Sequence, residues 1–213
     1  GRPVSLAIDR PDPVNPQTIL KAVDLTIRKP DGSIAIDDAS FEVRTGEILG
    51  IAGIAGSGQK ELCEAIAGLC PAEKGAVLYK KENLIGKSPR EIFQLGVHLG
   101  FVPEDRLGMG LVASMGMVGN MMLKTYDQNK GPFVDPKPAR SQAENLVKRL
   151  SIVTPSVDTP VRLMSGGNVQ KVLLGREIES NPQVLITAYP VRGLDINSSY
   201  TVCLLYTSDA ADD

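Results

Sequence analysis

Cysteine, histidine and long apolar segments are scarce in this sequence. The spacing of the few cysteines and the shortness of the apolar segments each argue against a class of function. The chain of 213 residues contains three cysteines and one histidine. No cysteines show Cys-x-x-Cys spacing, so the sequence predicts neither a zinc site nor a disulfide framework, and a reducing compartment fits best. No apolar run approaches the roughly 20 residues that span a bilayer, and no signal peptide is visible. Any role at a membrane must therefore come through a partner.

A large excess of charge is also absent, because the formal net charge is −2. A broad positive surface for nucleic acid is therefore not indicated, and we expect no nucleic-acid partner. The composition that remains is that of an ordinary globular protein, and the chain is long enough for one domain with a sizeable core.

The two ends of the chain differ from the rest. Residues 1–16 contain four prolines and few periodic apolar positions, which predicts a linker. The chain begins with Gly1 and not with Met, so we expect a fragment. Residues 203–213 resemble the translation of a sequencing adapter, and the alternative is a natural acidic C-terminus. Residues 17–202 are therefore treated as the domain.

Segments typical of strands and helices alternate along residues 17–202. The expected strands are 19–28, 33–44, 47–52, 97–102 and 184–188, with a hairpin at 75–84. The expected helices are 60–67, one that begins after Ser88, 136–150 and 168–179. Strands that alternate with helices predict an α/β fold with a parallel sheet.

A glycine-rich segment joins the buried strand expected at 47–52 to the helix expected at 60–67. Its sequence is Gly53-Ile54-Ala55-Gly56-Ser57-Gly58-Gln59-Lys60-Glu61. Glycines let backbone N–H groups surround phosphate oxygens, and the positive end of a helix favours the same anion. A working phosphate loop continues with Lys and then Ser or Thr, but this chain has Gln59 and Lys60. Lys60 is turned by about 100° around the helix, so we expect it to miss the phosphates. The alternative interpretation is an ordinary tight turn.

Three further segments carry patterns of interest. Residues 164–171 are Met-Ser165-Gly166-Gly167-Asn168-Val-Gln170-Lys, which would expose N–H donors at a helix start; a simple serine N-cap is the alternative. Residues 184–195 end in Ala188-Tyr189-Pro190-Val-Arg-Gly193-Leu194-Asp195. Residues 100–106 are Gly-Phe-Val-Pro-Glu104-Asp105-Arg106, for which a polar surface turn is the alternative.

Together, and in this order, these segments closely resemble the Walker A, Q-loop, signature and Walker B motifs of the ABC-transporter ATPases. The resemblance covers about residues 17–202 and is closest to the C-terminal ATPase domain of tandem importers for nucleosides and simple sugars. It implies a P-loop core, an antiparallel β subdomain and a helical subdomain around 108–165. We expect the end of the family fold to be missing, which makes independent stability doubtful.

The resemblance also assigns roles to single positions. Active members end the Walker B strand with Asp-Glu-Pro, where Asp orients Mg²⁺ and Glu activates water. Ala188 and Tyr189 occupy those places here, while Glu104 occupies the Q-loop position and Asp195 lies in a loop that joins two ATPase halves. Residues 29–32 offer no aromatic to stack on adenine. His98 is expected to be a packing or surface residue.

These assignments predict the second half of an importer ATPase with a degenerate ATP site. The positions implied to contact its own nucleotide are Gly53, Gly56, Ser57, Gly58, Gln59, Lys60 and Glu61. The positions implied to complete the ATP site of the first half in trans are Ser165, Gly166, Gly167, Asn168 and Gln170. ATP is the implied cofactor, with Mg²⁺ at the partner half.

The implied partners are the first half of the same polypeptide, permease subunits at the cytoplasmic face of the plasma membrane and, indirectly, a solute-binding protein. Three alternatives remain: an active hydrolase that uses Lys60, a soluble ABC protein without a membrane partner, and a fragment without activity.

Overall fold

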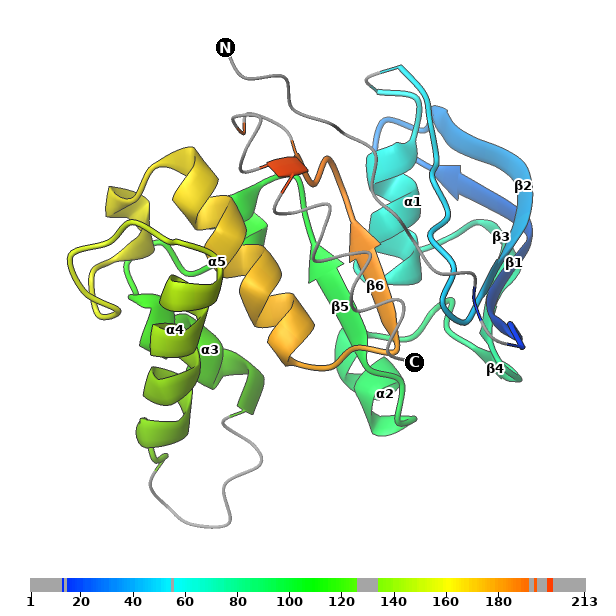
Figure 1. The fold of residues 1–213 in the computed structure, drawn as a ribbon. Helices are drawn as coiled ribbons and strands as arrows, with labels where there is room; N and C mark the ends of the chain where they lie inside the picture. Colours follow the sequence, from blue (N-terminus) through cyan, green and yellow to red (C-terminus); the bar gives the residue numbers. More distant parts are fainter. Residues whose placement is uncertain are drawn as a thin grey trace. The chain divides into compact units, whose positions relative to one another are not determined.

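The computed structural model describes residues 13, 15–54, 56–125, 134–191, 194 and 199–200, and Figure 1 shows its ribbon. They divide into two compact units, one built mainly on residues 100–185 and one on residues up to 99 with 186–188. Most of the predicted linker, the predicted scar at 203–213 and Asp195 lie outside the described residues.

An antiparallel sheet dominates the unit that contains residues up to 99. β1 (Thr18–Arg28) lies between β2 (Ile34–Arg44) and β3 (Lys74–Tyr79), and β4 (Glu82–Asn83) pairs with β3. In the register, Ala22 of β1 is opposite Phe41 of β2 and Val77 of β3. The apolar side chains of β1 that are buried are Leu20, Ala22, Leu25 and Ile27. The alternation in the sequence therefore predicted this strand, but the buried positions do not alternate strictly, because the register shifts between Ala22 and Leu25.

Two short helices of this unit begin where the sequence predicted. α1 (Gln59–Ile66) follows Gly58 and packs against β1 and β2. α2 (Pro89–Gln94) begins with a capping box, in which the Ser88 hydroxyl accepts from the Glu91 N–H and the Glu91 carboxylate accepts from the Ser88 N–H. His98 is exposed, with its ring 5.0 Å from that of Phe93.

The strand predicted at 47–52 is wrong. Residues 47–54 have no regular secondary structure, and Ile48 and Ile51 are about half exposed, at 48% and 49%. An apolar run indicates a strand buried on both faces, but such a strand forms only where neighbours complete its hydrogen bonds. In the described part of the chain, β5 (Leu99–Val102) and β6 (Val184–Thr187) form a sheet of two strands only. The apolar composition of residues 47–52 indicates a propensity for strand, but within the described residues no neighbouring strand pairs with this segment.

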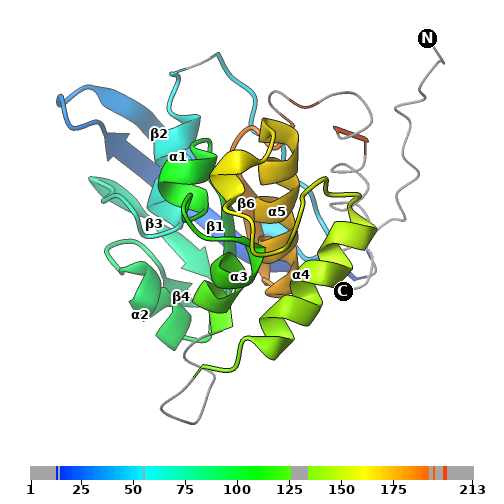
Figure 2. The same ribbon diagram turned by 90° about the vertical axis from the view of Figure 1, so that its left-hand side faces the viewer.

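Helices dominate the unit built on residues 100–185. α3 (Met117–Thr125), α4 (Lys137–Arg149) and α5 (Gly166–Glu179) pack on one another, and Figure 2 shows them together. α4 matches the helix predicted at 136–150, and α5 begins two residues before the helix predicted at 168–179. The buried face of α4 consists of Ala139, Ala143 and Leu146.

Two short helical segments complete this unit: a π-helical turn at Arg106–Gly110 (η1) and a 3₁₀ turn at Val161–Leu163. The sequence predicted neither of these turns, nor α3. No helix among the described residues has both the length and the apolar character that crossing a bilayer requires.

Candidate nucleotide-binding site

The glycine-rich loop has a backbone that only glycine adopts easily. Gly56 and Gly58 have φ of 87° and 99°, in the left-handed region. A Cβ at Gly58 would collide with the carbonyl oxygen of Ala35 at the start of β2. No side chain caps the first turn of α1, so the N–H groups at this helix start have no side-chain acceptor and suit an anion.

Gln59, which the resemblance assigns to the position of the phosphate-binding lysine, lies against the loop backbone at Gly53. A Cβ at Gly53 would collide with the Nε2 atom of Gln59, so the amide folds back onto the loop backbone. The Ser57 hydroxyl lies 2.8 Å from the Ile54 carbonyl oxygen and 3.0 Å from Gln59 Oε1, and donates to both. This position therefore offers a neutral amide donor where a working loop has a cation.

Lys60 is directed along the helix. Its Nζ lies 3.8 Å from Oε1 of Glu64 one turn later, and the side chain is 56% exposed. An exposed i,i+4 pair of this kind contributes little to stability. Glu61 lies in the first turn of α1, where a carboxylate suits the helix dipole but repels a phosphate.

The residues at the Walker B position do not fit a metal. Ala188 follows β6 and belongs to the same unit as the glycine-rich loop. Mg²⁺ requires oxygen ligands, and the methyl group of Ala188 and the ammonium of Lys60 provide none. Among the described residues, no group of three or more His, Cys, Asp or Glu could hold a metal ion. Tyr189 belongs to the other unit, is 39% exposed and has φ of 50°.

The signature-like segment begins α5 with a side-chain cap. The Ser165 hydroxyl accepts from the Asn168 backbone N–H at 3.4 Å and from Asn168 Nδ2 at 3.0 Å. Asn168 Oδ1 in turn accepts from the Val153 N–H at 3.0 Å. A Cβ at Gly167 would make only an ordinary contact. The groups left to meet an anion are therefore mainly the backbone N–H donors of the first turn.

Gln170 differs from the other signature positions. Its side chain is only 1% exposed, and Nε2 donates to the Pro190 carbonyl at 3.0 Å. This bond fixes the start of the loop that follows β6. Gln170 is thus placed in the interior of its unit, while the other four predicted positions lie at the helix start.

The segment after β5 is tied to the signature-like helix. Asp105 caps the π-helical turn by accepting from the Gly108 N–H at 2.8 Å. Arg106 Nη1 donates to the Gly166 carbonyl at 3.0 Å, and partial burial lowers the pKa of the Arg106 guanidinium. Glu104 is exposed and precedes this turn. The segment predicted as a Q-loop therefore contacts the signature-like segment directly.

A buried charge network also holds this segment, and no sequence pattern predicted it. Glu177 is fully buried, and its Oε2 accepts from the Phe101 N–H at 3.0 Å and from Lys124 Nζ at 2.8 Å. Its Oε1 accepts from Arg176 at 2.7 and 2.9 Å, and Arg176 also donates to the Gly110 carbonyl at 2.7 Å. The network joins β5, η1, α3 and α5.

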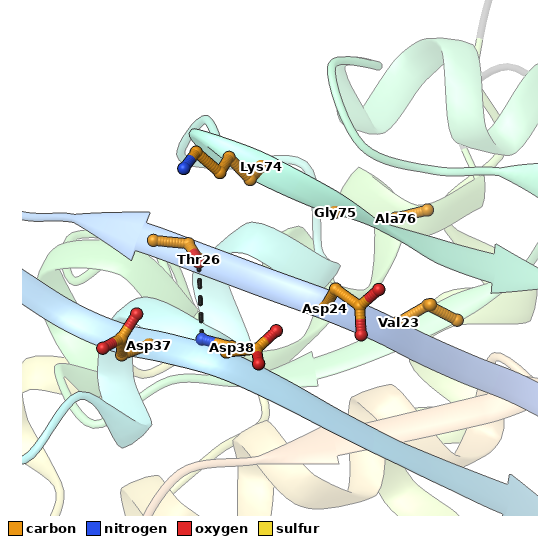
Figure 3. A pocket seen from close by; sticks show the side chains of 8 residues that line it. All are labelled: Val23, Asp24, Thr26, Asp37, Asp38, Lys74, Gly75 and Ala76. Atoms are coloured by element: carbon orange, nitrogen blue, oxygen red, sulfur yellow. Dashed lines mark hydrogen bonds between the residues drawn. The ribbon is translucent and has the colours of Figure 1, made fainter.

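A cavity lies on the antiparallel sheet, and no residue of the glycine-rich loop is among those that line it. Figure 3 shows it from close by, with Asp24 on β1 and Asp37 and Asp38 on β2. Its volume is about 430 Å³, and the Thr26 hydroxyl accepts from the Asp38 N–H at 3.4 Å. Three carboxylates against one lysine, Lys74, repel phosphate groups, so this cavity is not a nucleotide site.

Sequence comparison places the chain among known transporters. The family model for the ABC transporter matches residues 36–190. The chain is 36% identical over 201 residues to the nucleoside import ATP-binding protein NupA of Lactococcus lactis, covering 93% of this chain and 39% of NupA. It is 39% identical over 183 residues to the galactofuranose transporter ATP-binding protein YtfR of Escherichia coli, covering 85% of this chain and 36% of YtfR. The chain thus spans about two-fifths of the length of these curated relatives.

Solved structures share the fold. The ATP-binding cassette MJ0796, in a dimeric post-hydrolysis state bound to ADP and phosphate, superposes with a TM-score of 0.77 at 20% identity, covering 90% of this chain and 84% of that one. An ADP-bound ATP-binding cassette, MJ1267, gives a TM-score of 0.69 at 20% identity, covering 92% and 78%. These likenesses confirm the predicted fold class, a P-loop ABC ATPase fold with an antiparallel β subdomain and helical elements. From the family match and these relatives, the chain belongs to the ABC transporter family as an ATP-binding domain.

Proposed function

We propose that this chain is the second ATPase half of an importer for nucleosides or simple sugars, and that its own ATP site turns over poorly. The likeness to import ATP-binding proteins such as NupA and YtfR supports the importer role. In this role the chain works with a first ATPase half and with permease subunits, and lies at the cytoplasmic face of the membrane.

One contrast carries the proposal: the groups that process ATP are replaced, whereas the anion-binding helix start is kept. Gln59 offers a neutral amide, Lys60 is directed toward Glu64, and Ala188 leaves a metal without its carboxylate ligand. Losing a hydrogen bond to a charged group costs about 1.5–3 kcal/mol. The chain's own site therefore binds nucleotide weakly or holds it without turnover.

The N–H donors at the start of α5 serve the other half. ABC ATPase domains pair head-to-tail, so that the signature of one meets the nucleotide of the other. Ser165, Gly166, Gly167 and Asn168 would contact the triphosphate of the first half, where Mg²⁺ is expected. Arg106 donates to the Gly166 carbonyl at 3.0 Å, so this bond uses a carbonyl of the turn and leaves its N–H groups available. The direction of Lys60 disfavours the alternative of a hydrolase based on that residue.

A pair of substitutions at Ser165 tests the role in trans. Ser165→Asp and Ser165→Asn both keep a good N-cap, so both should preserve α5. The carboxylate of Ser165→Asp would face the triphosphate of the first half and should reduce ATP hydrolysis by the assembled transporter at least tenfold, because like charges repel. Ser165→Asn should lose much less. Equal hydrolysis by the two variants in proteoliposomes would contradict the proposal.

A further inference from the structure

The chain's own phosphate loop receives a cation from outside the loop. Lys29, at the start of the β1–β2 turn, donates from Nζ to the carbonyl oxygen of Gly56 at 3.1 Å. Gly56 lies in the middle of the loop, and both residues belong to the same compact unit. The sequence alone did not point to Lys29, because it lies 27 positions before Gly56.

The turn that carries Lys29 is fixed by its own hydrogen bonds. The Lys29 N–H donates to the Ser33 carbonyl, and the Gly32 N–H donates to the Lys29 carbonyl, both at 2.9 Å. Arg28 Nη1 donates to the Gly32 carbonyl at 2.9 Å. The neighbouring carboxylate of Asp31 is occupied by the N–H and hydroxyl of Ser33. The hydrogen bonds from Ser33 and, to a smaller extent, the charge of Lys29 lower the pKa of the Asp31 carboxyl. The ammonium of Lys29 therefore extends from a closed turn with its hydrogen bond directed to the loop.

A second contact holds the start of β2 against the loop. Gly58 lies so close to the Ala35 carbonyl that a Cβ on this glycine would collide with it. The hairpin thus meets the loop on both sides of the turn, through Lys29 and through Ala35. Within the described part of the chain, the Gly56 carbonyl is the one hydrogen-bond partner of the Lys29 ammonium. A lysine has three donors, so two remain for a ligand.

We propose that Lys29 supplies the positive charge for a nucleoside triphosphate at this loop, in place of the lysine that Gln59 replaces. The inference rests on the proposed function, because it concerns the ATP site that this function describes as weak. The N–H groups at the uncapped start of α1 would bind the phosphate oxygens, and Lys29 would balance their charge from the hairpin side. Gln59 would add a neutral donor.

Competitive photolabelling of the complete natural protein that contains this sequence tests the proposal. The probe is 8-azido-ATP, and only labelled peptides from this chain are counted, which excludes any other nucleotide site. ATP, inorganic tripolyphosphate and adenosine are the competitors. Because Lys29 acts on phosphates, Lys29→Gln should raise the ATP and tripolyphosphate concentrations needed for competition by about 10- to 100-fold, the equivalent of one lost charged hydrogen bond. Competition by adenosine should not change.

Three further variants separate charge from packing. Lys29→Gln can still donate to the Gly56 carbonyl but has no charge, whereas Lys29→Arg keeps the charge and should stay within about threefold of the natural protein. Lys21→Gln removes an exposed lysine of β1 and is the control, for which we expect little effect. Lys60→Gln removes the lysine that is directed toward Glu64 and tests the alternative in which that residue supplies the charge; its effect should be much smaller than that of Lys29→Gln.

Three results would overturn the inference. ATP and tripolyphosphate could compete with labelling of Lys29→Gln at the same concentrations as in the natural protein, Lys60→Gln could produce the large loss instead, or the probe could fail to label this chain at all. The proposed function has a separate test, because the Ser165 pair is measured as hydrolysis at the other half. If Ser165→Asp reduces hydrolysis as expected but Lys29→Gln leaves competition unchanged, only the inference about Lys29 is contradicted. If Lys29→Gln weakens competition but the two Ser165 variants hydrolyse ATP equally, the role in trans is contradicted.

Discussion

Replacement of Glu177 should destabilise the helical unit more than any surface change on the same helix. The Glu177 side chain is completely buried, and the Arg176 side chain with which it pairs is 9% exposed. Glu177→Ala would leave that guanidinium without its carboxylate and would also leave the Phe101 N–H without an acceptor. Removing one partner of a buried ion pair costs about 3–5 kcal/mol. Lys124 is 34% exposed and can be solvated after the substitution, so its loss of a partner adds little to this free-energy cost.

A matched control lies two residues further along the same helix. Glu179 pairs with Arg149 at 2.9 Å, with side chains 32% and 48% exposed. Exposed pairs of this kind contribute about 0–1 kcal/mol. Glu179→Ala removes the same number of atoms and the same charge from α5, so the difference between the two variants isolates burial.

Hydrogen exchange followed by mass spectrometry measures this difference inside the complete protein. Peptides from α5 and β5 report the free energy of local opening independently of other domains. Glu177→Ala should speed exchange of the slowest amides of α5 by at least about 150-fold, which corresponds to about 3 kcal/mol or more. If Glu177→Ala and Glu179→Ala exchanged at similar rates, the network would not support the unit and the reasoning would fail.

Two other predictions concern the loop and the helix that follows it. Nucleotide photolabelling of this chain should persist in EDTA, because Ala188 provides no metal ligand. Hydrolysis by the assembled transporter should stop under the same conditions. Loss of the labelling in EDTA would indicate that another residue of this site binds a metal. Burial and the charge of Glu64 raise the pKa of the Cys63 thiol to about 11, so at pH 8 its thiolate fraction is about 100-fold lower than at the usual pKa of 9. Iodoacetamide should therefore modify Cys63 about 100-fold more slowly in the folded protein than in urea, and comparable rates would contradict the burial of Cys63.

Local signals predicted those elements whose cause is local. Ser88 and Pro89 predicted the start of α2 because a cap acts over three residues, and the apolar face of α4 is visible in its 3.6-residue period. The sequence did not predict α3, because a single buried asparagine, Asn120, holds this helix and a single polar residue produces no periodic pattern. Asn120 is fully buried and bonds the backbone of Val112 twice, as well as the Met115 and Gly116 carbonyls. An asparagine in a sequence usually indicates a turn or a surface, so such a site is invisible before folding.

In the candidate site, too, features set by adjacent residues could be predicted, whereas contacts between distant residues could not. The glycine spacing and the displacement of Lys60 were visible in the sequence, because they depend on adjacent positions. Lys29 and Glu177 were not, since their partners Gly56 and Phe101 lie 27 and 76 positions away. Gln170 was expected at the helix start with its neighbours, but the helical turn carries it into the interior. Contacts between distant segments decide these cases, and no short pattern encodes them.

The two helix starts also differ in what they leave for an anion. At α5, the Ser165 hydroxyl already accepts two hydrogen bonds from Asn168, so part of the demand of that first turn is satisfied within the chain. At α1, no side chain caps the turn, and the Ser57 hydroxyl is engaged with the Ile54 carbonyl. Free N–H groups at a helix start require water or a ligand. The first turn of α1 therefore has the greater need for an anion or water, which supports the proposal that this loop binds nucleotide.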